Sequence, residues 1–168
     1  GNVLFEVSNW NVYHPDYADR KMVDNVNIKV KKGEVLGIAG LMGAGRTELA
    51  MSIFGKTYGQ KISGIIKKEG TEVHIKNVQD AIDAGIAYVT EDRKEAGLNL
   101  IDDIRHNITI SSLKKVSQYG VINDQSEILI AEEYRKSMKI KTPSITQLTG
   151  NLSGGNQQKV VLSRWVYA

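Results

Sequence analysis

A glycine-rich run in the first third of the chain contains residue types that bind phosphate. The run reads Gly40-Leu41-Met42-Gly43-Ala44-Gly45-Arg46-Thr47. It has the spacing of a phosphate-binding loop, G-x4-G-K-[ST], except that arginine stands where lysine is usual. Glycines allow backbone N–H groups to point inward around phosphate oxygens, and a following helix offers the positive end of its dipole. The run therefore predicts a nucleotide-binding loop.

Two residues of this loop can also contact a nucleotide through their side chains. The hydroxyl of Thr47 is placed to bind Mg²⁺, and Arg46 keeps a positive charge near the β- and γ-phosphates. Because a guanidinium is a planar fork and a lysine ammonium is compact, we expect altered catalysis more than lost charge. The alternative is a glycine-rich turn that binds no ligand.

The segments that flank the loop favour a ligand, because they match a buried strand before it and a helix after it. Residues 35–39 are continuously apolar, as in a strand covered on both faces of a parallel sheet. The apolar residues of 46–54 share one helical face, and Gly55 is placed to end that helix. Residues 86–89 predict a second buried strand.

Other parts of the chain show the patterns of an antiparallel sheet and of helices. Alternating apolar and polar residues, or short strand-like runs, occur at residues 3–10, 26–30, 62–66 and 71–75. Residues 102–141 lose this pattern, and Ile130, Tyr134 and Met138 recur at four-residue spacing, which predicts helices.

A second run with the composition of an anion site precedes the last predicted helix. It reads Asn151-Leu152-Ser153-Gly154-Gly155-Asn156-Gln157-Gln158-Lys159. Ser153 is a natural N-cap, but two glycines in the first helical turn lower helix stability. Close approach of the backbone to a ligand accounts for them, whereas a simple capped helix leaves them unexplained.

Composition excludes several classes of protein. The 168 residues are 41% hydrophobic and 24% charged, as in an ordinary soluble α/β domain. A net charge of +3 without a basic run argues against a dedicated nucleic-acid binder. The absence of cysteine excludes disulfides and thiolate metal sites. The apolar segments are too short to cross a bilayer, so we expect any membrane role to be peripheral.

Taken together, the two runs resemble the nucleotide-binding domain of ABC transporters, whose signature is Leu-Ser-Gly-Gly-Gln. Asn156 replaces the signature glutamine, and Arg46 replaces the loop lysine. With both changes the chain resembles the second ATP-binding domain of the tandem ATPase subunit in bacterial monosaccharide importers, a family that includes the ribose, galactose, xylose and multiple-sugar types. The likeness continues through residues 32–34, 87–94 and 97–98.

The resemblance implies cofactors, partners and a location. ATP and Mg²⁺ would bind at residues 40–47, while Ser153, Gly154 and Gly155 would act in trans on the γ-phosphate held by a sibling domain. A membrane permease and, indirectly, a sugar-binding protein would complete an importer at the cytoplasmic face of the membrane, without nucleic acid. One alternative is a non-hydrolysing regulatory half that lends its signature to the sibling. Another is a soluble ABC protein of DNA repair or translation, which the small net charge disfavours.

The resemblance also assigns roles to two further side chains. Glu91 stands where the family has a glutamine that contacts Mg²⁺ and the membrane subunits; the alternative is an ordinary solvated acid. Tyr17 matches the aromatic residue that stacks on adenine, with Tyr13 as the second choice, and a plain surface tyrosine is the alternative.

The expected fold is α/β, a P-loop NTPase domain of the ABC type. By this resemblance an antiparallel β subdomain covers residues 1–34 and about 60–76, and a RecA-like core covers 35–59 and 77–100. A helical subdomain covers about 101–152, and the signature helix covers 153–168. An apolar strand ending in Asp-Glu, and a later histidine, follow the signature helix in the family. Since neither occurs here, we expect the front part of a domain, able to bind ATP but inactive alone.

Overall fold

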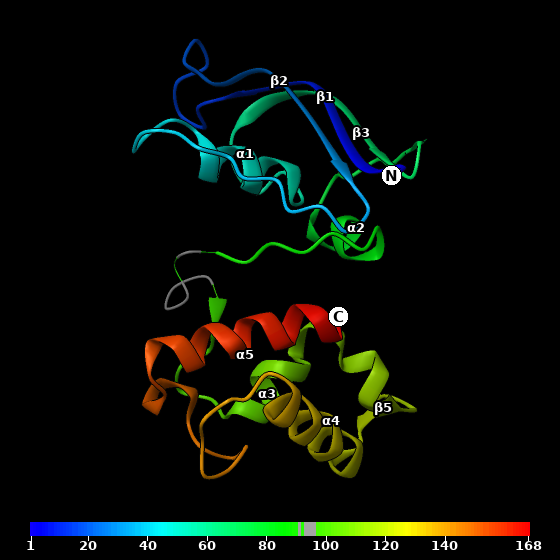
Figure 1. Cartoon of the computed structure of the whole chain (residues 1–168), viewed down its shortest axis with the longest axis vertical. Helices are drawn as coiled ribbons and strands as arrows, with labels where there is room; N and C mark the ends of the chain where they lie inside the picture. Colours follow the sequence, from blue (N-terminus) through cyan, green and yellow to red (C-terminus); the bar gives the residue numbers. More distant parts are fainter. Residues whose placement is uncertain (91, 93–96) are drawn as a thin grey trace. The chain divides into compact units, whose positions relative to one another are not determined.

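The chain folds into two units, Gly1–Tyr88 and Val89–Ala168. A computed structural model describes residues 1–90, 92 and 97–168 (Figure 1). Each unit has its own buried side chains, so the phosphate-loop run and the signature run are positioned by different sets of elements.

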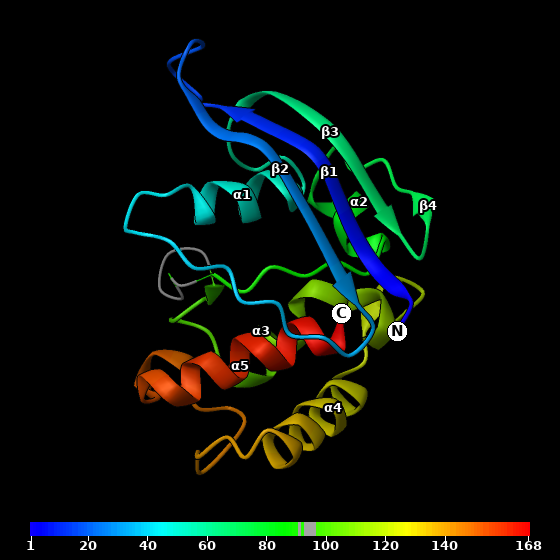
Figure 2. The ribbon, with the colours of Figure 1, turned by 45° about the horizontal axis from the view of Figure 1, so that its top comes forward.

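A four-stranded antiparallel sheet forms one side of the first unit. Its order is β2-β1-β3-β4, with β1 at Val3–Tyr13, β2 at Lys21–Lys31, β3 at Gln60–Lys68 and β4 at Thr71–Glu72 (Figure 2). These strands confirm the predicted antiparallel sheet, although β1, β2 and β3 are longer and β4 is shorter than the patterns indicated. At the β3–β4 turn Gly70 has a φ of 82°, a value that glycine adopts without strain.

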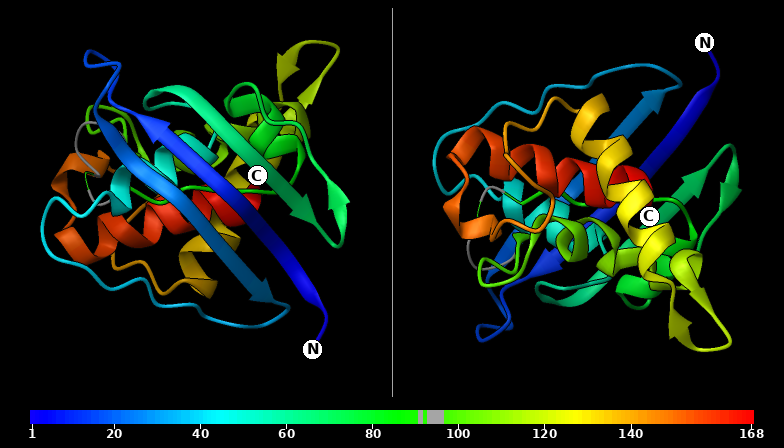
Figure 3. Two further views of the ribbon diagram at one scale, coloured as in Figure 1. Left: turned by 90° about the horizontal axis from the view of Figure 1, so that it is seen from above. Right: turned by 90° about the horizontal axis from the view of Figure 1, so that it is seen from below.

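Two helices, α1 at Arg46–Ile53 and α2 at Val78–Asp83, lie on the same face of this sheet (Figure 3). Both end near a glycine in the left-handed conformation, Gly55 with φ 74° and Gly85 with φ 72°. Gly55 therefore ends α1 as its position in the sequence predicted.

The predicted buried strands at residues 35–39 and 86–89 are wrong for this structure. Neither segment belongs to a strand, and Val35 is 96% exposed. A strand of a parallel sheet needs neighbours that complete its hydrogen bonds and helices that cover both faces. Among the described residues, every strand pair is antiparallel and none includes either segment. Continuous apolar character alone does not supply those partners.

The second unit is mainly helical and includes a short hairpin. Its elements are α3 (Ile104–Thr109), η2 (Ile110–Val116), β5 (Ser117–Gln118), β6 (Val121–Ile122), α4 (Asp124–Ser137), η3 (Thr149–Asn151) and α5 (Gly154–Tyr167). The helices confirm the prediction for residues 102–141, but the two-residue strands β5 and β6 were not predicted. Strands this short offer too few residues for an alternating pattern to be recognised.

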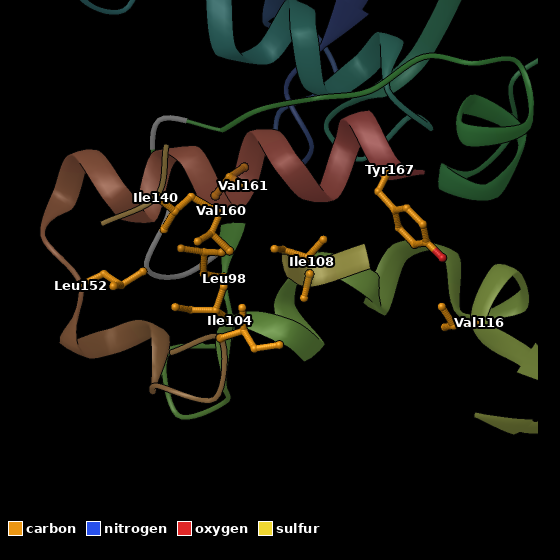
Figure 4. Close-up of a cluster of buried hydrophobic side chains, with 11 residues drawn as sticks. Leu98, Ile104, Ile108, Val116, Ile140, Leu152, Val160, Val161 and Tyr167 are labelled. Carbon is orange, nitrogen blue, oxygen red and sulfur yellow. The ribbon is translucent and has the colours of Figure 1, made fainter. Parts of the chain in front are cut away.

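Buried apolar side chains hold α5 against the rest of this unit. Val160 and Val161 of α5 pack in a cluster with Ile104 and Ile108 of α3, together with Ile140 from the segment after α4 (Figure 4). This burial fixes which face of α5 is covered, and it leaves the start of the helix outside the core.

A buried amide adds a directional link between α5 and α3. Arg164 of α5 donates from Nε to the Asn107 carbonyl oxygen and from its terminal nitrogen to Asn107 Oδ1, both at 2.8 Å. Asn107 Nδ2 in turn donates to Thr149 Oγ1 at 3.0 Å, just before the signature run. Burial lowers the pKa of Arg164 below its ordinary value. Apolar packing and the hydrogen bonds of Asn107 therefore both fix the position of α5 against α3.

None of the helices in the described ranges combines the length and the apolar character needed to cross a membrane.

Candidate nucleotide-binding site

Two glycines of residues 40–47 have a left-handed backbone, and a helix begins directly after the second of them. Gly43 has a φ of 80° and Gly45 a φ of 83°, and Gly45 is the N-cap of α1. No side chain caps the first N–H groups of α1. An uncapped helix start next to glycines with positive φ has the donors that a phosphate group requires.

The glycine at position 45 also has a reason within the fold. A Cβ atom there would lie 2.7 Å from the carbonyl oxygen of Met22 in β2, and residue 45 is buried. At Gly43 a Cβ atom would meet nothing within 4 Å. The sequence pattern attributed Gly45 to close approach of phosphates, whereas the structure adds the close approach of β2.

The side chain of Arg46 extends back over the start of the loop. A Cβ atom at Gly40 would lie 3.7 Å from both Cδ and Nε of Arg46. Arg46 is exposed, at the first position of α1, and Thr47 follows it as an exposed residue. The arginine thus holds its positive charge beside the loop amides, where an anion would bind.

The helix that follows the loop is anchored to the sheet by a buried hydrogen bond. Trp10 Nε1 in β1 donates to Ser52 Oγ in α1 at 3.0 Å, and Ser52 Oγ donates to the Leu49 carbonyl oxygen at 2.8 Å. A pocket of about 230 Å³ lies beside this helix start, lined by Gly45, Arg46, Ile38 and residues of β2. The sheet therefore fixes the direction in which α1 presents its N-terminus.

The two candidate tyrosines differ in how their rings are covered. Tyr17 is 63% exposed, in the connection between β1 and β2, with its ring centroid 4.9 Å from that of His14. The ring of Tyr13 has the ammonium groups of Lys21 and Lys61 at 5.7 and 5.6 Å from its centroid. Tyr17 thus offers more open ring surface for stacking than Tyr13 does.

Tyr58, which follows α1, lies among charged residues of α1 and of the connection that holds Tyr17. Tyr58 is close enough to Glu48 of α1, and to Arg20 and Asp16 of this connection, for their charges to affect it; its pKa is raised mainly by burial, with Glu48 contributing. The connection that holds Tyr17 and the loop before α1 lie at the same end of the sheet (Figure 2).

The signature run forms the start of α5. Ser153 is the N-cap, with φ −61° and ψ 154°, yet its side chain does not cap the helix. Gly154 and Gly155 occupy the first two helical positions, and a Cβ atom at Gly155 would meet nothing within 4 Å. Close packing inside the unit therefore does not account for Gly155, which agrees with a surface reserved for a ligand.

Asn156, which the sequence analysis noted only because it replaces the signature glutamine, is part of this helix start. Asn156 bonds both to Ser153 and to the backbone of Lys141, each at 2.9 Å. The signal was present in the spacing, because Ser-x-x-Asn places Asn156 where a capping box has its reciprocal residue.

The predicted site residues lie in separate parts of the chain. Residues 40–47 and Tyr17 belong to the first unit, and Ser153, Gly154 and Gly155 belong to the second. Glu91 lies outside the described residues.

A match to a protein family decides the classification. The profile of the ABC transporter family matches residues 23–168. The chain belongs to the ABC transporter family. The match covers both motifs, from β2 through the phosphate loop to α5. The fold is that of an ABC transporter ATPase domain, as predicted from the two motifs.

Curated relatives within the ABC family are named as sugar-import ATP-binding proteins. The L-arabinose transport ATP-binding protein AraG of Geobacillus stearothermophilus is 58% identical over 168 residues, which is 100% of this chain and 33% of the relative. The xylose import ATP-binding protein XylG of Thermoanaerobacter pseudethanolicus is 50% identical over 99% of this chain and 33% of its own length. The chain thus spans about a third of the length of these relatives.

Solved structures of ABC proteins have the same fold at low sequence identity. CbiO1 of Clostridium perfringens, part of the ABC transporter complex cbiONQ, superposes with a TM-score of 0.71 at 16% identity, over 99% of this chain and 62% of that one. The ATP-binding cassette MJ1267 gives a TM-score of 0.73 at 20% identity, over 98% and 65% of the two chains.

Proposed function

We propose that the chain is the nucleotide-binding part of an ATPase subunit that powers import of a monosaccharide. The observation that carries the proposal is the loop of residues 40–47, in which two glycines with positive φ precede an uncapped helix and Arg46 extends over the loop. Relatives named for arabinose and xylose transport support the substrate class. Residue types and geometry at the loop fit the triphosphate of ATP.

The residues of the loop have distinct roles in this proposal. Backbone N–H groups of residues 40–45 would surround the phosphates, Arg46 would place a positive charge beside them, and the Thr47 hydroxyl would hold Mg²⁺. Tyr17 would stack on adenine, and the Glu91 carboxylate would accept a hydrogen bond from a water molecule bound to Mg²⁺. When bound, Mg²⁺ neutralises charge on the β- and γ-phosphates. The chain itself binds and orients the nucleotide.

We infer further that the signature run acts on ATP held by a sibling domain. Ser153, Gly154 and Gly155 leave a hydroxyl and the first amides of α5 uncapped, which suits a phosphate supplied by another domain. In this arrangement the chain is the second of two ATP-binding domains, attached to a permease at the cytoplasmic face of the membrane. A sugar-binding protein delivers the sugar to that permease.

Substitution of Ser153 in the whole importer tests this arrangement. Ser153→Arg would fill the anion site with a long side chain, so ATP hydrolysis at the sibling site should fall about a hundredfold or more, as for the loss of a transition-state donor. Gln158→Arg is the matched control, because it adds the same charge at an exposed position of α5. ATPase activity and sugar uptake are measured for both. Normal uptake with Ser153→Arg would contradict the action in trans.

A further inference from the structure

The side chain of Asn156 has an orientation that its neighbours determine. Its Oδ1 atom accepts a hydrogen bond from the backbone N–H of Lys141 at 2.9 Å. A backbone N–H can only donate, so the amide oxygen must face Lys141 and the amide nitrogen must face Ser153. The hydrogen bond at that end, 2.9 Å long, therefore runs from Asn156 Nδ2 to Ser153 Oγ.

The direction of this bond constrains the Ser153 hydroxyl proton. Since Oγ accepts from Asn156, its own proton cannot point along the same line and must be directed elsewhere. An N-cap serine usually accepts from an amide of the first turn, but Ser153 makes no such bond. Among the described residues, Asn156 is the one hydrogen-bond partner of Ser153 Oγ. The hydroxyl proton is therefore available to donate to a group outside the helix.

The other end of the bridge is firmly placed. Ile140, next to Lys141, is buried in the core of the second unit, and its N–H donates to the Arg135 carbonyl oxygen at 2.9 Å. Lys159 Nζ of α5 donates to the Lys139 carbonyl oxygen at 2.8 Å. The core that Ile140 shares with Val160 and Val161, together with the Lys159 bond, thus holds this segment against α5, so the amide of Asn156 has a fixed partner.

We propose that Asn156 is a positioning residue that orients the Ser153 hydroxyl to donate its proton to a phosphate oxygen of ATP. The inference rests on the proposed function, since the phosphate is the one that the signature would contact in trans. Asparagine has the length that spans the two fixed partners, and glutamine would add a methylene to a bridge whose ends do not move.

Asn156→Asp in the whole importer reverses the hydrogen bond without removing the bridge. One carboxylate oxygen can still accept from Lys141, but the other must accept from Ser153 and turns the hydroxyl proton inward. We expect kcat for ATP hydrolysis to fall roughly tenfold or more, the effect of one hydrogen bond to a charged group, with KM nearly unchanged. Asn156→Ala frees the hydroxyl to rotate, so its loss of kcat should be smaller. Gln158→Asp controls for the added negative charge.

A double-mutant cycle with Ser153→Ala separates positioning from other effects. If Asn156 acts through the hydroxyl, Asn156→Asp should change kcat less than about twofold once Ser153→Ala is present. A full further loss in that background would overturn the inference alone, because the aspartate would then act without the hydroxyl. Unchanged turnover with Ser153→Ala by itself would overturn both the inference and the trans role in the proposed function.

Discussion

Gly43 and Gly45 share a left-handed backbone but differ in what surrounds them. A Cβ atom at Gly43 would meet nothing within 4 Å, whereas one at Gly45 would lie 2.7 Å from the Met22 carbonyl oxygen. The first glycine is required by backbone conformation, and the second by conformation and by β2. Only a comparison of substitutions at both positions separates these two requirements.

We predict that Gly45→Ala lowers the free energy of unfolding more than Gly43→Ala does. The left-handed conformation alone costs about 1–2 kcal/mol for a residue with a Cβ atom, and position 45 adds a contact with backbone that cannot turn away. Urea denaturation of the 168-residue chain measures both values. Equal losses at the two positions would show that the contact with Met22 relaxes at no cost.

His106 of α3 has a shifted pKa, which makes the stability of the fold depend on pH. The pKa of His106 is raised mainly by its hydrogen bond with Asp102, 2.9 Å long, and further by the charges of Asp103 and Glu127. For Asp102, burial opposes ionisation, but the bonds from His106 and from the Asp103 backbone lower its pKa overall. Arg105 also contacts the imidazole, at 3.1 Å from Nε2.

We predict that the stability of the chain falls as pH rises through the raised pKa of His106. A group whose pKa is higher in the folded state stabilises that state while it is protonated, so its contribution is complete below the ordinary histidine pKa of about 6.5 and is lost as pH rises through the raised pKa. The lowered pKa of Asp102 has the opposite sign, and its contribution disappears as pH falls below about 4. The free energy of unfolding measured from pH 5 to 8 should therefore decline in the wild type. In His106→Gln that decline should be shallower; an identical slope would contradict the assignment.

At the scale of elements, α1 depends on one buried polar contact with the sheet. Ser52→Ala leaves Trp10 Nε1 without the oxygen that it donates to, and an unpaired buried donor costs about 1–3 kcal/mol. We predict a loss of that size in chemical denaturation. Ser137→Ala, at an exposed position of α4, is the matched control and should change stability by a few tenths of a kcal/mol.

A double-mutant cycle would attribute that loss to the hydrogen bond. With Trp10→Phe already present, Ser52→Ala should cost much less, because no indole donor remains. Undiminished cost in this background would mean that Ser52 stabilises α1 through its bond to Leu49 instead.

Local patterns were sufficient to predict the elements whose signal lies within one segment, even where the partner strand is distant in sequence, as β3 is from β1. The antiparallel strands, the helix after the phosphate loop and its end at Gly55 all depend on alternation or on turn chemistry, which a single segment displays. The predicted strands at residues 35–39 and 86–89 were wrong because a parallel strand forms only where neighbouring strands complete its hydrogen bonds. The link from Asn156 to Lys141 was missed for a related reason, since 15 residues separate its ends.

For the molecule as a whole, we propose that residues 40–47 bind one ATP molecule and that the start of α5 contacts a second ATP molecule, held by a sibling domain. The two runs lie in different units, and each has amides that no side chain caps. If the claim holds, substitutions in the two runs should have different effects on the affinity of this chain for ATP.

Titration of the 168-residue chain with Mg-ATP in a calorimeter tests this claim most directly. We predict binding by the wild type, a loss of about tenfold or more in affinity with Arg46→Ala, which removes a charge-assisted contact, and wild-type affinity with Ser153→Arg. Absence of binding by the wild type, or loss of binding with Ser153→Arg at an intact fold by circular dichroism, would contradict the account.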